Sequence, residues 1–240
     1  MMQIEGSVAF VSGANRGVGA CFVQTLLAHG ARKVYAGARD VALVPTNDSR
    51  VIPVKLDVTR AEDVAHTADL ASDLNLLVNN AGINRLVPPF SARHVDAARA
   101  EMEVNYFGTL NMTLAFAPAL KRQGGAIINV LSILARATLP AMTSLSASKA
   151  AALRMTEGMR AELGPHGVRV LAVMPGAIDT DMMRDVDDTP KLAPSEVVLA
   201  TLAALGDGTD DVYVGDMARQ LACGLATDRS AVLKRLAGNG

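Results

Sequence analysis

Apolar and polar residues follow two different rhythms along this chain. Short apolar runs of strand length recur, and most are followed by a stretch in which apolar residues return every three or four positions. The first rhythm is typical of buried strands and the second of amphipathic helices. The strand-like runs are Val8–Val11, Lys33–Gly37, Val51–Leu56, Leu74–Val78, Ala126–Val130, Arg169–Val173 and, as an edge strand, Asp211–Val214. This alternation predicts an α/β fold with a doubly wound, mostly parallel sheet and helices on both faces.

The helical stretches between these runs have recognisable ends. A long helical region covers about Arg93 to Leu120, and the helix that carries Lys149 ends before Gly164-Pro165. Thr59 and Glu62 have the spacing of a capping box, in which both side chains bond free helix N–H groups. No repeat or linker interrupts the pattern, so we expect a single domain over residues 1–240.

Composition and charge exclude several classes of protein. Lys and Arg number 23 against 24 Asp and Glu, whereas nucleic-acid-binding proteins normally have a basic surface. No apolar run reaches the ~20 residues that span a bilayer, and the N-terminus has no signal-peptide pattern. Cys21 and Cys223 have no metal-ligand partners at useful spacing. We therefore expect a cytoplasmic protein without a metal, a nucleic-acid partner or a membrane anchor.

A glycine-rich turn follows the first strand directly. It reads Ser12-Gly13-Ala14-Asn15-Arg16-Gly17-Val18-Gly19, with the spacing G-x-x-x-G-x-G. A strand, a glycine turn and a helix together present free backbone N–H groups to a diphosphate. Glycine-rich turns also occur as plain connections. The position directly after the first strand favours a dinucleotide site.

The end of the second strand indicates which dinucleotide is bound. An acid at position 38 would bond the ribose hydroxyls of NAD, but the sequence has Ala38 followed by Arg39. Arg16 in the glycine turn can converge on the same region, and arginine binds phosphate in bidentate fashion. This pattern favours NADP(H), although both arginines could be solvated surface charges and Asp40 could weaken the site.

Four further motifs occur in a fixed order after the glycine turn. They are Leu56-Asp57-Val58, Asn79-Asn80-Ala81-Gly82, Val104-Asn105-Tyr106 and Pro175-Gly176-Ala177-Ile178-Asp179-Thr180. Between the last two stands Leu145-Ser146-Ala147-Ser148-Lys149, with Ser132 upstream. Each motif alone indicates only a turn or a helix, but together they cover nearly the whole chain. In this order they resemble the short-chain dehydrogenase/reductase family.

That resemblance implies a Rossmann-like sheet of about seven strands and a hydride transfer between nicotinamide and a carbonyl or alcohol. It implies that Ser132 bonds the substrate oxygen, Lys149 binds the nicotinamide ribose, and Asn105 holds a water of the proton relay. It also implies a homodimer or homotetramer. The cofactor-binding positions that it implies are Gly13, Asn15, Arg16, Gly17, Val18, Gly19, Ala38, Arg39, Asp57, Val58, Asn80, Ala81, Gly82, Lys149, Pro175, Gly176, Ile178 and Thr180.

The resemblance fails at one position, where the family's proton-donating tyrosine should be. This chain has Leu145, which can neither donate nor accept a proton. Residues 145 and 149 share a helix face, so the lysine would lie beside methyl groups. Positioned acid–base catalysis contributes about 10²–10⁴-fold, so its loss impairs but does not abolish hydride transfer.

Three functions stay open at this stage. The first is an NADP(H)-dependent oxidoreductase impaired for ordinary ketone reduction. The second is a scaffold repurposed for tyrosine-independent chemistry, such as conjugate reduction or isomerisation, and the third is a non-catalytic NADPH-binding regulator. The segments expected to line the pocket, Ile83–Ser91, Ala135–Ser144 and Asp181–Lys191, are mostly apolar. They predict a largely apolar carbonyl or alcohol as the small-molecule substrate.

Overall fold

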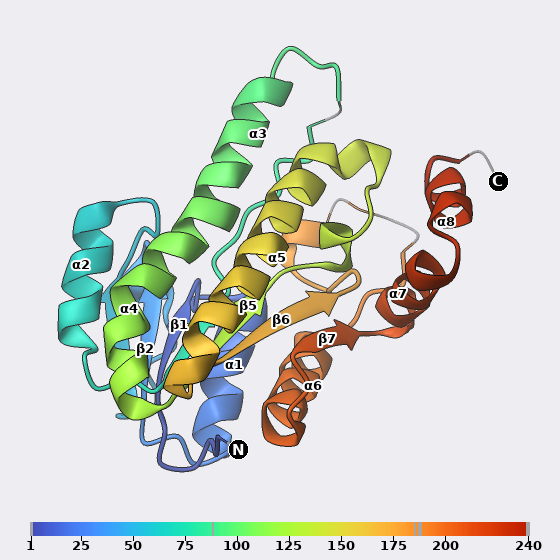
Figure 1. Ribbon diagram of the computed structural model, residues 1–240. Coiled ribbons are helices and arrows are strands. Elements are labelled where there is room, and N and C mark those ends of the chain that lie inside the picture. Colours follow the sequence, from blue (N-terminus) through green and yellow to red (C-terminus); the bar gives the residue numbers. More distant parts are fainter. Residues whose placement is uncertain (1, 88, 185, 187–188, 239–240) are drawn as a thin grey trace.

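A seven-stranded parallel sheet forms the centre of the molecule (Figure 1). The computed structural model describes residues 2–87, 89–184, 186 and 189–238. The strands lie in the order β3-β2-β1-β4-β5-β6-β7. Their bounds are β1 Val8–Ser12, β2 Lys33–Ala38, β3 Val51–Lys55, β4 Leu76–Asn79, β5 Ala126–Val130, β6 Arg169–Pro175 and β7 Asp211–Val214. All seven strands predicted from the apolar runs are confirmed, with ends that differ by at most a few residues.

Helices cover both faces of this sheet, as predicted for a doubly wound fold. The bounds of the α-helices are α1 Gly17–Ala28, α2 Ala61–Leu70, α3 His94–Met102, α4 Thr109–Gln123, α5 Thr143–Leu163, α6 Pro194–Asp207, α7 Asp216–Thr227 and α8 Arg229–Leu236. Short 3-10 helices are η1 Val41–Leu43, η3 Ile133–Ala135, η4 Pro140–Met142, η5 Gly164–His166 and η6 Asp181–Met183. α7 and α8 were not anticipated from the sequence.

The alternation along β1 divides the core into two layers. Ala9 and Val11 pack with α1 and α6, whereas Val8 and Phe10 pack with α2, α4 and α5. Because successive strand residues point to opposite faces, a strand covered on both sides is apolar throughout. β3 contains Pro53, which its position at the sheet edge permits.

The predicted long helical region is interrupted by a π-helical turn. Glu103–Gly108 (η2) joins α3 to α4 without a break in direction, and Asn105 lies in this turn. π-helical turns are rare and frequent at functional sites. The predicted capping box at Thr59 and Glu62 is wrong, because the helix starts at Ala61 and Thr59 donates to Asp57 instead.

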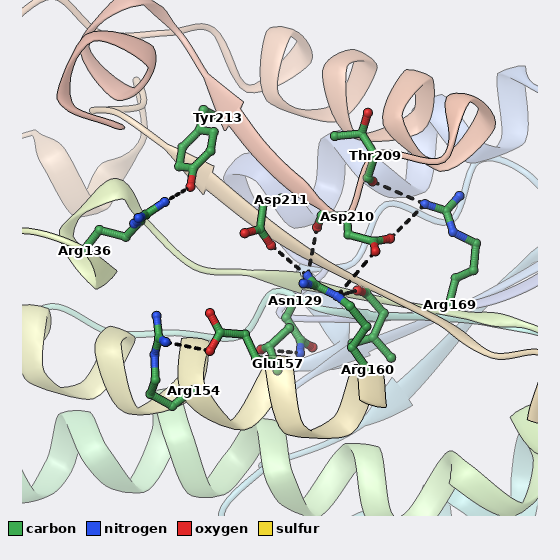
Figure 2. A network of polar contacts seen from close by, with 12 residues as sticks. Asn129, Arg136, Arg154, Glu157, Arg160, Arg169, Thr209, Asp210, Asp211 and Tyr213 are labelled. Atoms are coloured by element: carbon green, nitrogen blue, oxygen red, sulfur yellow. Dashed lines mark hydrogen bonds and ion pairs between the residues drawn. The ribbon is translucent and has the colours of Figure 1, made fainter. Parts of the chain in front are cut away.

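Two polar networks fix α5, the helix that carries position 145. Figure 2 shows Arg160 of α5 reaching Asp210 and Asp211 at the start of β7, while Arg169 also binds Asp210. A second network is buried under the helices: Asn79 binds Thr113 of α4 and Asn129, and Asn129 binds Thr156 of α5. α4 and α5 are therefore attached to β4 and β5 by bonds independent of position 145.

No helix in the described part of the chain is long and apolar enough to cross a membrane.

Candidate active site

The glycine turn packs closely against its neighbours at the carboxyl ends of the strands. Gly13 and Gly17 have φ of 66° and 54°, in the left-handed region that favours glycine. A Cβ on Gly17 would lie 3.2 Å from Cγ2 of Thr180, and one on Gly19 would overlap the Gly13 carbonyl oxygen. The close contact at Gly19 is therefore with the glycine turn itself.

The start of α1 is open to an anion. Arg16 is its N-cap residue, yet no side chain caps the helix and no acidic residue lies in the first turn. The first amide groups of a helix lack partners within the helix and carry a partial positive charge. Val18 is buried in the core and fixes this end of the helix, whereas Asn15 in the turn is partly exposed.

Ser12 and Asn80 join the glycine turn to the end of β4. The Ser12 hydroxyl accepts hydrogen bonds from the Asn80 and Ala81 amides at 3.0 and 3.1 Å. The Asn80 side chain donates to the carbonyls of Ser12 and Gly13 at 3.0 and 3.2 Å. Sequence reasoning missed Ser12, whose only signal is its place at the junction of strand and glycine turn.

Charged residues gather where β2 and β3 end. Arg39, Lys55, Asp57, Arg60 and Asp63 line an open cavity of about 270 Å³. The buried Ala38 ends β2 just before Arg39. Sequence reasoning anticipated Arg39 and Asp57 but missed the other three, because they come from separate elements.

Asp57 is held in its ionised form at this cavity. Partial burial opposes ionisation, but hydrogen bonds from Thr59 and the charges of Arg39 and Arg60 outweigh it and lower the Asp57 pKa. The Asp40 carboxylate accepts a hydrogen bond from the Ala42 amide and so caps η1. Val58 is buried against Gly108.

Arg16 pairs across the opening of the glycine turn. Its guanidinium lies 3.1 Å from Oδ2 of Asp181, and Asp181 also pairs with Arg184. The sequence suggested that Arg16 converges with Arg39, but the structure places the Arg16 side chain beside Asp181 instead. The Pro175-Gly176 turn precedes this pair: Gly176 donates to Val214 of β7, and Ile178 pairs with Leu192. Of the expected pocket segment 181–191, residues 185, 187 and 188 lie outside the described residues.

Lys149 is buried on α5, and its ammonium group points at the sheet. Nζ donates to the Val130 carbonyl at 3.0 Å. Burial lowers the pKa of Lys149 to about 8. The lysine therefore keeps its charge at neutral pH but can release a proton in mildly alkaline solution.

Asn105 meets Lys149 at Gly82. A Cβ on Gly82 would lie 3.2 Å from Asn105 Oδ1 and 3.5 Å from Lys149 Nζ. The Asn105 side chain accepts from the Ile83 amide at 2.9 Å and donates to the Ile83 carbonyl and to Ser148 Oγ at 3.0 Å. These two sequence-predicted residues thus approach the Asn-Asn-Ala-Gly turn at the same point, next to Gly82.

Ser132 is the N-cap residue of η3 and lies two residues after the end of β5. Its Oγ accepts a hydrogen bond from the Leu134 amide at 3.1 Å, which leaves the hydroxyl proton free to donate. Leu134 in turn packs against Leu145. The serine is therefore held at the edge of the surface that Leu145 forms.

Leu145 lies in an apolar cluster at the start of α5. It is only 7% exposed and packs with Leu134 and Met142. The partly buried side chains against this group are Leu86, Leu139, Met183 and Val186. We call these seven residues the apolar wall.

Known proteins with the same architecture place this site in context. The model of the family described as short chain dehydrogenase matches residues 7–191. A crystal structure of a short chain dehydrogenase from Burkholderia cenocepacia in complex with NADP is 61% identical, with a TM-score of 0.95 over 98% of this chain and 99% of that one. A short-chain dehydrogenase from Streptomyces avermitilis is 25% identical, with a TM-score of 0.84 over 96% of each chain.

The curated relatives point the same way. An uncharacterized oxidoreductase of Staphylococcus saprophyticus is 33% identical over 219 residues, which are 85% of this chain and 93% of that protein. The family motifs, the sheet order and these matches agree over most of the sequence. The chain belongs to the short-chain dehydrogenase family of oxidoreductases.

Proposed function

We propose that this protein is an NADP(H)-dependent oxidoreductase that transfers hydride between the nicotinamide and a carbonyl or alcohol group without a tyrosine acid. The observation that carries the proposal is the meeting of Lys149 and Asn105 at Gly82, beside a leucine at position 145. The site thus keeps the lysine for the ribose and the asparagine, whereas the phenol of the family's tyrosine is absent.

The residues present fit a phosphorylated dinucleotide. The uncapped start of α1 and the glycine turn suit the diphosphate. The cations Arg39, Lys55 and Arg60 at the cavity beyond β2 suit a 2′-phosphate. The Burkholderia relative was crystallised with NADP, which supports the same choice here. When bound, the nicotinamide would supply or accept the hydride.

Each polar residue of the site has a chemical task in this proposal. Lys149, charged below its pKa of about 8, binds a ribose hydroxyl. Ser132 donates its free proton to the substrate oxygen and so polarises the carbonyl. Both ends of the Asn105 side chain are engaged, so we assign it the positioning of Ile83 and Ser148.

The proton for a product alcohol must come from a group other than residue 145. Water, or Ser132 with the charged Lys149 behind it, can deliver it more slowly than a phenol. The apolar wall borders this point, and its side chains offer only dispersion and hydrophobic contact. We therefore propose a largely apolar substrate.

The test is a comparison of this protein with Leu145→Tyr. We expect NADPH binding by both proteins, and a rise of about 10²–10⁴-fold in NADPH oxidation with simple ketones and aldehydes on introduction of the tyrosine. Leu145→Met is the matched control, because it changes the side chain but adds no proton donor. Equal turnover of the leucine and tyrosine forms across a broad carbonyl panel would contradict the proposal.

The packing of Leu145 favours one second candidate. Leu145 is buried in a cluster of apolar side chains, so its surroundings suit a leucine. Such surroundings are expected for a reaction that needs no tyrosine acid, such as conjugate reduction or isomerisation. That candidate predicts activity on an activated alkene in the natural form and its loss in Leu145→Tyr. Tight NADPH binding without turnover of either substrate class would indicate a regulator.

We also propose a homo-oligomer formed through the α3–α4 and α5 helices. Phe107 and Leu114, which are 42% and 63% exposed, lie on this continuous helix and offer apolar surface to a second copy. Light scattering of the natural chain and of Leu114→Glu tests this, with loss of the dimer or tetramer expected in the variant. Leu199→Glu, on α6, is the control.

A further inference from the structure

Glu101 is an acidic residue that the structure buries almost completely, although no motif described above includes it. It lies on α3, one turn before Asn105, and is 1% exposed. Its Oε1 accepts a hydrogen bond from the Arg85 amide at 2.6 Å. Its Oε2 is buried and has no partner among the described residues. A carboxyl group buried in this way costs free energy, so its presence calls for a function.

Glu101 and Asn105 hold the same loop at two successive points. Asn105 binds both backbone groups of Ile83, and Glu101 binds the amide of Arg85. Four residues of helix rise about 6 Å, and two residues of loop span at most about 7 Å. The helix face therefore matches the loop, and the loop that follows the Asn-Asn-Ala-Gly turn is fixed from one side.

The loop continues from these two points to the apolar wall. Leu86 follows Arg85 directly and has a φ of 48°, a left-handed conformation that is unfavourable for a leucine. Its amide donates to Asn84 Oδ1 at 3.1 Å, and its side chain packs with the group that contains Leu145. Hydrogen bonds from the Arg85 and Leu86 amides thus hold the unfavourable backbone conformation that brings the Leu86 side chain to the apolar wall.

We propose that Glu101 is a positioning residue that sets the size of the substrate pocket by holding Leu86 against the apolar wall. The proposal rests on the proposed function in taking this wall as the substrate surface. Without an acceptor at position 101, the Arg85 amide loses its partner and Leu86 relaxes out of the left-handed region. The apolar wall then opens beside Leu145, and kcat/KM for longer substrates rises relative to kcat/KM for shorter ones.

The substitutions Glu101→Met and Glu101→Gln separate positioning from acid chemistry. Met fills the space without an acceptor, whereas Gln keeps the carbonyl oxygen but cannot exchange the carboxyl proton. Positioning therefore predicts that Gln behaves like the natural protein and Met does not. A Gln variant as impaired as the Met variant would overturn the proposal in favour of a proton-handling role. Glu103→Gln is the control, because Glu103 lies two residues further along the helix and is exposed.

Two measurements complete the test. Hydrogen exchange of the peptide covering residues 83–87 should become about tenfold faster in Glu101→Met and stay unchanged in Glu101→Gln and the control. With NADPH and aldehydes of increasing chain length, the ratio of kcat/KM for long over short aldehydes should rise several-fold in Glu101→Met only.

Unchanged exchange in a folded Met variant, or faster exchange with an unchanged chain-length ratio, would overturn the positioning role. Absence of turnover in every form, the natural one included, would count against the proposed function instead. The exchange measurement would then still decide whether Glu101 holds the loop.

Discussion

The cofactor end and the substrate end of this molecule are held together by different forces. At the glycine turn, backbone groups from two strand ends bond one another through Ser12 and Asn80, and an added Cβ on Gly19 would meet a carbonyl oxygen. At the apolar wall, side chains from four separate segments meet by hydrophobic contact alone. Directional bonds with short distances fix one end, and adaptable packing forms the other.

This difference explains at which positions the sequence can differ from the family pattern. Apolar side chains of similar volume replace one another at a cost usually below about 1.5 kcal/mol. Leu145 is buried among six other apolar side chains, so this packing accommodates a residue other than the family's tyrosine. An equivalent change in the glycine turn would disturb two strand ends and the start of α1. The predictions below test this contrast, from the largest expected effect to the smallest.

Gly19→Ala should disrupt the proposed cofactor site at the glycine turn. Its Cβ would overlap the Gly13 carbonyl and lie 2.6 Å from Asn80 Nδ2, so the turn must shift. We expect NADPH affinity to fall about 100-fold or more, measured by fluorescence titration. The control is Gly158→Ala on α5, where nothing lies within 4 Å of the new Cβ and helix propensity should raise stability by about 1 kcal/mol. Equal NADPH affinity in both variants would refute the contrast.

Lys149→Met should stabilise the fold while removing function. Because burial lowers the lysine pKa from 10.5 to about 8, the charged form is penalised in the folded state. The penalty is present in full below pH 8 and disappears as the pH rises toward 10.5, where both states are neutral. The variant should therefore gain roughly 1–3 kcal/mol of unfolding free energy at pH 7, with a smaller gain near pH 10. Denaturant titrations at the two pH values measure this, and a gain independent of pH would contradict it.

Arg39→Ala should change cofactor choice without affecting the substrate end. Loss of a charged partner for a 2′-phosphate should weaken NADPH binding about tenfold, or about 1.4 kcal/mol, and leave NADH binding nearly unchanged. Isothermal titration with both dinucleotides provides the comparison. Arg154→Ala is a suitable control, because this exposed arginine pairs with Glu157 on α5. A parallel loss for NADH and NADPH would show that Arg39 does not distinguish them.

Asp181→Asn should have the smallest effect. The Arg16–Asp181 pair is exposed at both ends, and such pairs contribute about 0.2–1 kcal/mol. Its removal should free Arg16 and strengthen NADPH binding by at most a few-fold, most visibly at low salt. An effect larger than that of Arg39→Ala would mean that the pair controls access to the cofactor site.

The sheet could be predicted because its signals are local. Each strand is a short apolar run, and parallel strands buried on both faces need no partner to be recognised. The same holds for the glycine turn and for Asn80, each of which belongs to a short continuous motif. The helices α7 and α8 were missed because they form after the last strand and bury only a few side chains, such as Ala218 and Val232.

The parts of the site that escaped prediction depend on distant residues. Lys55 and Arg60 join Arg39 only because β2 and β3 end side by side. Glu101 offers no signal in the sequence, since a glutamate on a helix is nearly always exposed. Its burial follows from the packing of α3 against the loop after β4, and the left-handed Leu86 could be seen only once that loop had a conformation.

The buried chain of bonds from Thr113 through Asn79 and Asn129 to Thr156 has an evolutionary consequence. It anchors α4 and α5 to the sheet below the level of position 145, so the spacing of the two helices does not depend on which residue stands there. A lineage could therefore exchange tyrosine for leucine and keep α4 and α5 attached to the sheet. Selection could then act on the new chemistry alone, because the substitution leaves the architecture unchanged.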